Sequence, residues 1–115
     1  MSCLFDSLSY FFRMDGYSIR QTICDYLQQN KKIIDGLDTS FILSLDGNNY
    51  INRMRMNDTW GGAIEIQAAC NIWNVKIVIF NKRNRENSVI EFLPIDNRFS
   101  NIIKLSWNGS HYEPI

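Results

Sequence analysis

Histidine is almost absent from this sequence, since His111 is the only one in 115 residues. Cysteine is scarce too, and Cys3, Cys24 and Cys70 form no Cys-x-x-Cys pair and no metal-ligand spacing with the histidine. We therefore expect no metal site. An odd number of cysteines without a secretory leader is typical of free thiols in a reducing compartment, so we expect a cytoplasmic protein.

Net charge is missing as well, because 12 Lys and Arg residues balance 12 Asp and Glu residues. The chain therefore has no overall field that would recruit nucleic acid or an anionic membrane, and we expect neither as a partner. The basic cluster at residues 82–85 is followed directly by Glu86 and is interpreted as a solvated loop. No stretch of about eighteen apolar residues occurs, so no transmembrane helix is expected.

Apolar residues are plentiful by contrast, at 45% of a length that is typical of one domain. We therefore expect a single domain over residues 1–115. Apolar side chains recur at helical spacing over 4–12 and over 19–30. Ser18 and Gln21 match a capping box, which predicts that the second helix begins at Ser18.

The rest of the chain predicts a set of shorter elements. Helices are expected over 50–56 and 62–73, and strands over 75–80, 89–93, 102–107 and at His111-Tyr112. Residues 75–80 are almost continuously apolar, as in a central strand covered on both faces. Asn108-Gly109 is a tight-turn signal that folds His111 back beside the preceding strand, whereas residues 31–49 show turn signals and no clear element. This order predicts an α+β fold with helices packed on a small, mostly antiparallel twisted sheet.

Three short motifs stand far apart in the chain. Cys3-Leu4-Phe5 opens the first helical segment, Trp60 to Glu65 (WGGAIE) opens the 62–73 helix, and His111-Tyr112 lies near the end. In this order the motifs resemble the ovarian tumour (OTU) family of cysteine proteases, which are mainly deubiquitinases. The resemblance covers nearly the whole chain and implies an OTU-like fold.

The resemblance makes Cys3 the nucleophile and His111 the imidazole that takes the thiol proton and later returns it to the leaving amine. The thiolate at a helix N-terminus would attack the carbonyl of ubiquitin's terminal glycine in an isopeptide bond. A thioester would form, the lysine amine would leave, and water would then release ubiquitin. Without the motifs, Cys3 would be interpreted as a core cysteine and His111 as a surface residue.

Trp60, Gly61 and Gly62 resemble the family segment that lines a narrow channel for the Gly-Gly end of ubiquitin. A flat indole and bare backbone suit a tail that has no side chains. Two alternatives stay open: the glycines could serve a turn that needs permissive dihedral angles, and Trp60 could pack in the core. Tyr112, beside the histidine, is also expected to contact the substrate.

The chain departs from the family pattern before the nucleophile. Family members usually carry Asp-Gly-Asn or a similar loop there, and its backbone helps to form the oxyanion hole, but here Met1 and Ser2 precede Cys3. We expect Ser2 to contribute to this site only if packing holds a terminus that is otherwise mobile. Loss of one oxyanion donor costs roughly two to three powers of ten in rate. Either the enzyme compensates, or upstream sequence is missing from the chain.

A second departure concerns the residue that orients the imidazole. The family often places Asp or Asn two residues after the histidine, where this chain has Glu113. Residues i and i+2 of a strand share a face, so we expect Glu113 to complete the triad. The alternative is a solvated terminal carboxylate. Asp6, Asn57 and Asp58 are weaker candidates, chosen because they lie near the motifs.

The sequence is thus interpreted as a compact OTU-like deubiquitinating cysteine protease that needs no cofactor. The expected partners are ubiquitin or a ubiquitin-like modifier and ubiquitinated proteins. Its compact size favours a viral or parasite origin. The rival interpretations are an OTU-fold module that binds ubiquitin without turnover and an interaction scaffold with no affinity for the modifier.

Overall fold

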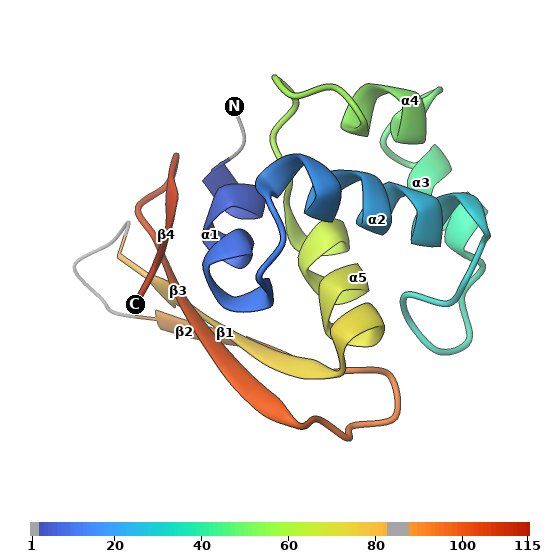
Figure 1. Ribbon diagram of the computed structural model, residues 1–115. Coiled ribbons are helices and arrows are strands. Elements are labelled where there is room, and N and C mark those ends of the chain that lie inside the picture. The colour runs from blue at the N-terminus through green and yellow to red at the C-terminus, as the bar shows by residue number, and fades with distance from the viewer. Residues whose placement is uncertain (1–2, 83–87) are drawn as a thin grey trace.

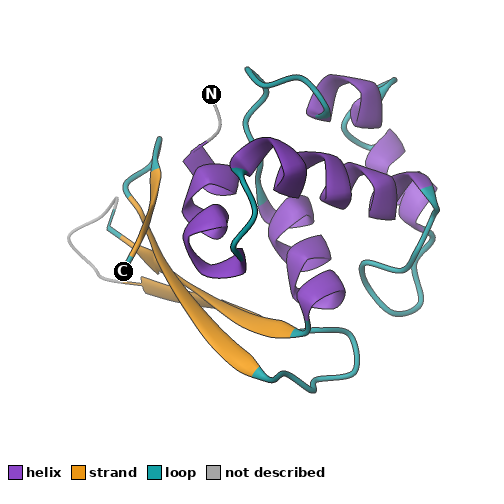
Figure 2. Ribbon diagram, in the orientation of Figure 1, coloured by secondary structure: helices purple, strands orange, loops and turns teal. Residues whose placement is uncertain are grey.

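The computed structural model describes residues 3–82 and 88–115. In this part of the chain the helices precede the strands and lie on one face of the sheet (Figures 1 and 2). The helices are α1 (Cys3–Phe12), α2 (Gly16–Gln28), α3 (Thr39–Ser44), α4 (Tyr50–Met54) and α5 (Ala63–Trp73). The strands are β1 (Val75–Asn81), β2 (Ser88–Phe92), β3 (Asn101–Trp107) and β4 (Tyr112–Pro114). The predicted α+β class is therefore confirmed.

The sheet is mixed, with strand order β2-β1-β3-β4. β1 pairs antiparallel with β2 and parallel with β3, and β3 pairs antiparallel with β4. The predicted position of β1 at the centre is correct, but the helices cover only one of its faces (Figure 1). Ile77 and Ile79 are buried in the core. On the opposite face Val78 is also buried, whereas Lys76 and Phe80 are half-buried.

The start of α2 differs from the prediction because Asp15, and not Ser18, is its N-cap. The Asp15 carboxylate accepts a hydrogen bond from the Ser18 N–H at 2.6 Å, and this bond lowers the pKa of Asp15. Gln21 does not reach back to close a capping box. Its amide donates instead to the carbonyl of Arg55, just beyond α4, at 3.0 Å.

α3 is an element that the sequence pattern did not predict. Its N-cap is Asp38, whose carboxylate accepts a hydrogen bond from the Phe41 N–H. With six residues, α3 is too short to show a helical period, so the cap was the only local signal. α4 agrees with the prediction in its start at Tyr50 and in its inward side chains, Tyr50 and Met54.

One core joins the helices to the covered face of the sheet. Its central side chains, each at most 2% exposed, include Leu4, Phe5, Leu8, Ile19, Ile23, Ile66, Ile77, Ile103 and Leu105. Burial of each such side chain contributes about 1.5–3 kcal/mol. The core fixes the beginning of α1 beside the last strand, as Figure 1 shows. No helix in the described residues is long and apolar enough to cross a bilayer.

Candidate active site

The first helix and the last strand bring a thiol and an imidazole together. Cys3 opens α1 and His111 directly precedes β4, and Cys3 Sγ lies 3.1 Å from His111 Nδ1. This distance is within hydrogen-bonding reach, although 108 positions separate the two residues in sequence. The structure therefore joins the two groups that thiol-based hydrolysis requires.

The surroundings of Cys3 differ from those of the other two cysteines. Cys3 is partly exposed, whereas Cys24 and Cys70 are fully buried. Burial raises the pKa of the Cys24 thiol to about 11 and that of Cys70 to about 12, so neither ionises readily near neutral pH. Cys3 also stands at the N-terminus of α1, where the helix dipole and free N–H groups favour an anion. Of the three thiols, Cys3 is the one suited to nucleophilic attack.

A hydrogen bond fixes α1 against β4. Ser7 is buried and lies one turn after Cys3, on the same face of the helix. Its hydroxyl donates to the carbonyl oxygen of Tyr112, and the two oxygens are 2.9 Å apart. Because Tyr112 follows His111, this bond holds the histidine backbone close to the nucleophile. Sequence reasoning missed Ser7, although its i, i+4 spacing from Cys3 was a usable signal.

The turn before β4 holds the backbone of His111. Asn108 Oδ1 accepts hydrogen bonds from the N–H groups of Ser110 and His111, at 3.0 and 2.8 Å. Gly109 has a φ of +102°, in the region where residues with a side chain are strained. The predicted Asn108-Gly109 turn is thus confirmed, and it directs His111 toward α1.

Trp60 and Gly61 form one side of a crevice at the nucleophile. Together with Cys3, Leu4 and Ser110 they line a space of about 10 Å³, which holds about one water molecule. The Trp60 indole is 50% exposed, and its centre is 6.4 Å from that of the imidazole. The interpretation of Trp60 as a core side chain is therefore wrong.

The two glycines of the motif have different surroundings. A Cβ on Gly61 would lie 2.8 Å from Leu4 Cδ2 and 2.9 Å from Phe5 Cζ, so any side chain would force these two side chains of α1 to shift. A Cβ on Gly62 would meet open space. Gly62 does not border the Cys3 crevice but lines a neighbouring cavity of about 510 Å³. Neither glycine has a positive φ, so permissive dihedral angles do not explain them.

The sequence matches the family model for OTU-like cysteine proteases over residues 2–112. The chain belongs to this family. Ubiquitin thioesterase otu2 of Schizosaccharomyces pombe (strain 972) is 27% identical over 128 residues, which cover 99% of this chain and 42% of that relative. The OTU domain thus spans less than half the length of this curated relative.

Solved OTU domains have the same fold. An OTU domain in complex with ubiquitin matches with a TM-score of 0.76 at 24% identity, over 98% of this chain and 62% of the other. The viral OTU domain protease from Dera Ghazi Khan virus matches with a TM-score of 0.68 at 24% identity, over 98% and 72%. The OTU-like fold expected from the three motifs is therefore confirmed.

The orienting role of Glu113 stays a prediction, because no contact in the described structure supports it. Glu113 is exposed on β4, opposite Ser106 of β3, and no hydrogen bond joins it to His111 in the described structure. The prediction assumed that His111 and Glu113 share one face of a strand. β4 covers Tyr112–Pro114, so His111 directly precedes the strand that carries Glu113. Asp6 and Asp58 also have no described hydrogen bond to the imidazole.

Tyr112 faces the core more than the crevice. Its ring is half-buried and stacks on Trp107 with ring centres 6.2 Å apart, and burial raises the pKa of its hydroxyl. Its backbone carbonyl, as the acceptor for Ser7, contributes more to the site geometry than its ring does. Ser2, the other expected contributor to substrate binding, lies outside the described residues.

Glu65 is a functional candidate that the sequence showed only as part of a motif. It is almost fully buried in the first turn of α5, where its Oε1 accepts a hydrogen bond from the Gly62 N–H at 2.8 Å. Its Oε2 accepts one from the Tyr50 hydroxyl at 2.5 Å. Burial raises the pKa of Glu65. The carboxyl group therefore joins α4 to the residues that precede α5.

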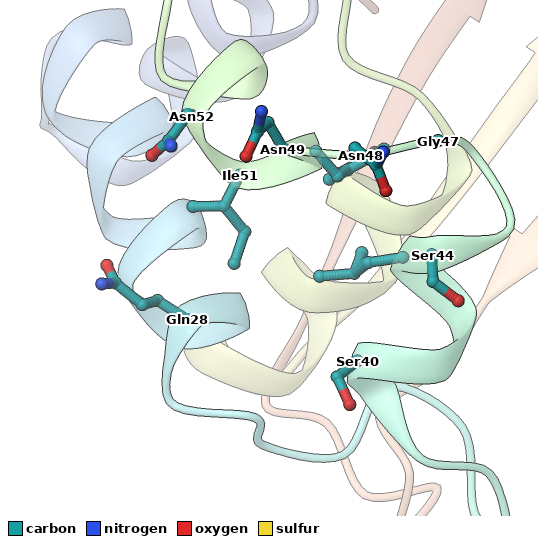
Figure 3. A pocket seen from close by; sticks show the side chains of 10 residues that line it. Gln28, Ser40, Ser44, Gly47, Asn48, Asn49, Ile51 and Asn52 are labelled. Carbon is teal, nitrogen blue, oxygen red and sulfur yellow. The ribbon is translucent and has the colours of Figure 1, made fainter.

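A separate hollow of about 390 Å³ lies on the side of α3 and α4 and contains no part of the Cys3 site (Figure 3). Carboxamides and hydroxyls surround it, including those of Gln28, Asn49, Asn52 and Ser40. Its lining includes no carboxylate, thiol or imidazole that could activate these hydroxyls. No cluster of three or more potential metal ligands occurs in residues 3–82 and 88–115.

Proposed function

We propose that this OTU domain is a deubiquitinating enzyme. It hydrolyses the isopeptide bond after the C-terminal Gly-Gly of ubiquitin or a ubiquitin-like modifier, with Cys3 as nucleophile and His111 as general base. The observation that carries the proposal is the 3.1 Å distance between Cys3 Sγ and His111 Nδ1. The match to a relative named as a ubiquitin thioesterase adds support, as does the fold shared with a ubiquitin-bound OTU domain.

The first half of the proposed reaction transfers the acyl group to sulfur. His111 Nδ1 takes the Cys3 thiol proton, and the thiolate attacks the glycine carbonyl carbon. The helix N-terminus at Cys3 stabilises negative charge on the sulfur and, in the tetrahedral intermediate, on the oxygen. The intermediate collapses to a thioester as the C–N bond breaks, and His111 gives its proton to the departing lysine amine.

The second half releases the modifier. His111 takes a proton from water, and the resulting hydroxide attacks the thioester carbonyl carbon. The C–S bond breaks, and the Cys3 thiolate recovers the proton from His111. The products are the glycine carboxyl group of the modifier, which releases its proton to solvent, and the enzyme in its starting state. The same imidazole accepts and then returns one proton in each half of the reaction, so the proposed chemistry needs no further titrating side chain.

The crevice beside Cys3 supports a substrate tail without side chains. Trp60 supplies a flat, half-exposed ring on one side, and Gly61 supplies bare backbone in contact with α1. Because Gly61 has no side chain on this side of the crevice, the surface beside Cys3 suits a tail that also has none. The proposed substrates are therefore ubiquitinated proteins, in which the modifier ends in Gly-Gly.

Ubiquitin with an electrophile at its C-terminus provides the test. We expect the parent chain and a control variant, Ser9→Ala, to form a covalent adduct with this probe. Cys3→Ala should form none, and His111→Ala should react at least about a hundredfold more slowly because the base is missing. Tight association without an adduct would instead support a ubiquitin-binding module. No association at all would contradict both functions and leave an interaction scaffold.

A further inference from the structure

Residues 54–62, here called the Trp60 segment, lead from the end of α4 to the start of α5. At the upstream end the segment is held by Arg20 of α2, whose side chain is 0% exposed. The guanidinium Nη1 donates to the Met54 carbonyl at 2.7 Å and Nη2 donates to the Asn57 carbonyl at 3.3 Å. One planar cation thus fixes two carbonyl groups three residues apart.

The same guanidinium also contacts the helix that carries the nucleophile. It lies over the ring of Phe5, with Arg20 Cζ 4.2 Å from the ring centre. Phe5 is two residues after Cys3, and its ring edge lies against Gly61, where a Cβ would be 2.9 Å from Phe5 Cζ. Phe5 therefore contacts both Arg20 and the Trp60 segment, and its position depends on both.

The downstream end of the Trp60 segment is held by Glu65. Its carboxyl group accepts the Gly62 N–H at 2.8 Å and the Tyr50 hydroxyl at 2.5 Å, as described above. Arg20 binds carbonyls at one end of the segment, and Glu65 binds an amide at the other. Trp60 and Gly61, which line the crevice, lie between these two attachments.

Packing alone does not explain a buried arginine in this place. Burial of a guanidinium costs several kcal/mol before its hydrogen bonds are counted, and an apolar side chain of similar volume often stabilises a fold as well or better. The connection between α2 and the end of α4 is also made at the surface, where Arg55 binds Gln21 at 2.7 Å and Asp25 at 2.8 Å. What Arg20 adds is a fixed direction and distance between α1 and the Trp60 segment.

We propose that Arg20 and Glu65 are positioning residues that set the separation between Cys3 and the Trp60–Gly61 side of the crevice. Neither touches the reacting atoms. Arg20 acts through Phe5 and the carbonyls of Met54 and Asn57, and Glu65 acts through the Gly62 amide. The inference rests on the proposed function, because the crevice is where the modifier tail would lie.

The rates of two reactions of Cys3 distinguish a positioning role from a loss of stability and from a change in the reactivity of the thiol. The rate of capture by the ubiquitin probe requires Cys3 together with a correctly spaced crevice. Alkylation by iodoacetamide requires only the Cys3 thiolate, since Cys24 and Cys70 are fully buried. The Cys3→Ala variant measures the background rate. Both rates are measured at a temperature where circular dichroism and thermal unfolding show each variant to be folded.

We expect Arg20→Met and Glu65→Leu to lower the capture rate at least about tenfold, because small misplacements of a substrate cost large factors in rate. Their alkylation rates should stay within about twofold of the parent, since the helix that carries Cys3 remains. Glu65→Gln should capture nearly as well as the parent, because its amide oxygen still accepts the Gly62 N–H. Arg20→Lys, which keeps the charge but not the flat two-pronged donor, should be intermediate.

The matched control is Asn71→Ala, at the opposite end of α5. The Asn71 side chain bonds the Lys32 carbonyl and the Ile95 N–H, both at 3.1 Å, so its loss removes tertiary hydrogen bonds away from the crevice. We expect both rates of this control to match the parent. Capture rates of folded Arg20→Met and Glu65→Leu that equal the parent's would overturn the inference. So would capture and alkylation rates that fall together in these variants, or a capture rate that falls equally in Asn71→Ala. A parent that alkylates normally but captures no ubiquitin would overturn the proposed function itself.

Discussion

At the scale of single residues, the contact between Gly61 and α1 determines how closely the crevice approaches Cys3. The distances of 2.8 and 2.9 Å from a Cβ at this position to Leu4 and Phe5 leave room for a methyl group only if these packed side chains shift. Gly62, one residue later, faces open space. Adjacent glycines in one motif therefore serve different purposes, and only one of them is required by packing.

We predict that Gly61→Ala destabilises the fold by about 1–3 kcal/mol, the usual range for overpacking. Gly62→Ala should cost less than about 1 kcal/mol, because the only loss there is a glycine N-cap. Urea unfolding of the two variants beside the parent measures both values. Equal destabilisation by the two substitutions would show that α1 adjusts to the added methyl group.

The orienting role of Glu113 is a prediction from the family pattern that mutagenesis can test. The Glu113 carboxylate is exposed and is not bonded to the imidazole. We therefore predict that Glu113→Gln and Glu113→Ala turn over a ubiquitin substrate within about threefold of the parent, far less than the roughly ten-thousandfold loss seen when a true triad carboxylate is neutralised. A loss of a hundredfold or more in both variants would return Glu113 to the orienting role.

At the scale of elements, the site depends on the docking of α1 against β4. Ser7 provides the described side-chain hydrogen bond between them, to the Tyr112 carbonyl at 2.9 Å. Ser9 lies on the same helix, but its hydroxyl bonds only within α1, to the Asp6 carbonyl at 2.5 Å. The two serines therefore differ in whether they reach the strand.

We predict that Ser7→Ala lowers stability by about 1 kcal/mol, the usual net value of one hydrogen bond. It should also lower turnover by about three- to tenfold, because the backbone beside His111 is no longer held against α1. Ser9→Ala should leave turnover unchanged. Steady-state hydrolysis of a fluorogenic ubiquitin substrate measures both effects. If Ser7→Ala and Ser9→Ala behave alike, β4 is positioned by packing and by its pairing with β3.

Local sequence patterns predicted the helices and strands whose apolar residues recur with a clear period. They did not predict features that depend on contacts between distant residues. α1, α4, α5 and the strands follow from apolar spacing and turn residues, and the Cys3–His111 pair follows from motif order. The parallel pairing of β1 with β3 could not be predicted in this way, because no local pattern indicates on which side of β1 the chain returns after β2. Arg20 also escaped notice, since arginine is rarely buried and its spacing on α2 gives no hint of its partners.

At the scale of the whole molecule, the buried carboxyl of Glu65 links stability to pH. Burial raises its pKa in the folded state above the ordinary value of about 4.3. The folded chain therefore binds this proton more tightly than the unfolded chain does. The stabilisation is complete below the unfolded pKa and is lost as the pH rises through the folded pKa.

We predict that the free energy of unfolding of the parent falls relative to that of Glu65→Gln as the pH rises above about 4.3. The glutamine cannot titrate, so the difference between the two chains isolates this group from the other carboxylates. Urea unfolding at a series of pH values measures it. A constant difference would mean that Tyr50, the Gly62 amide and Arg20 balance the effect of burial, and one that grows in favour of the parent would mean that they outweigh it.

The reacting pair unites residue 3 with residue 111, so no short stretch of the chain contains both groups. The thiol meets its proton acceptor only when α1 and β4 are both docked on the rest of the fold. A partly unfolded chain in which either element has detached thus displays a thiol without its proton acceptor. The proposed activity is consequently lost before the rest of the core has to unfold.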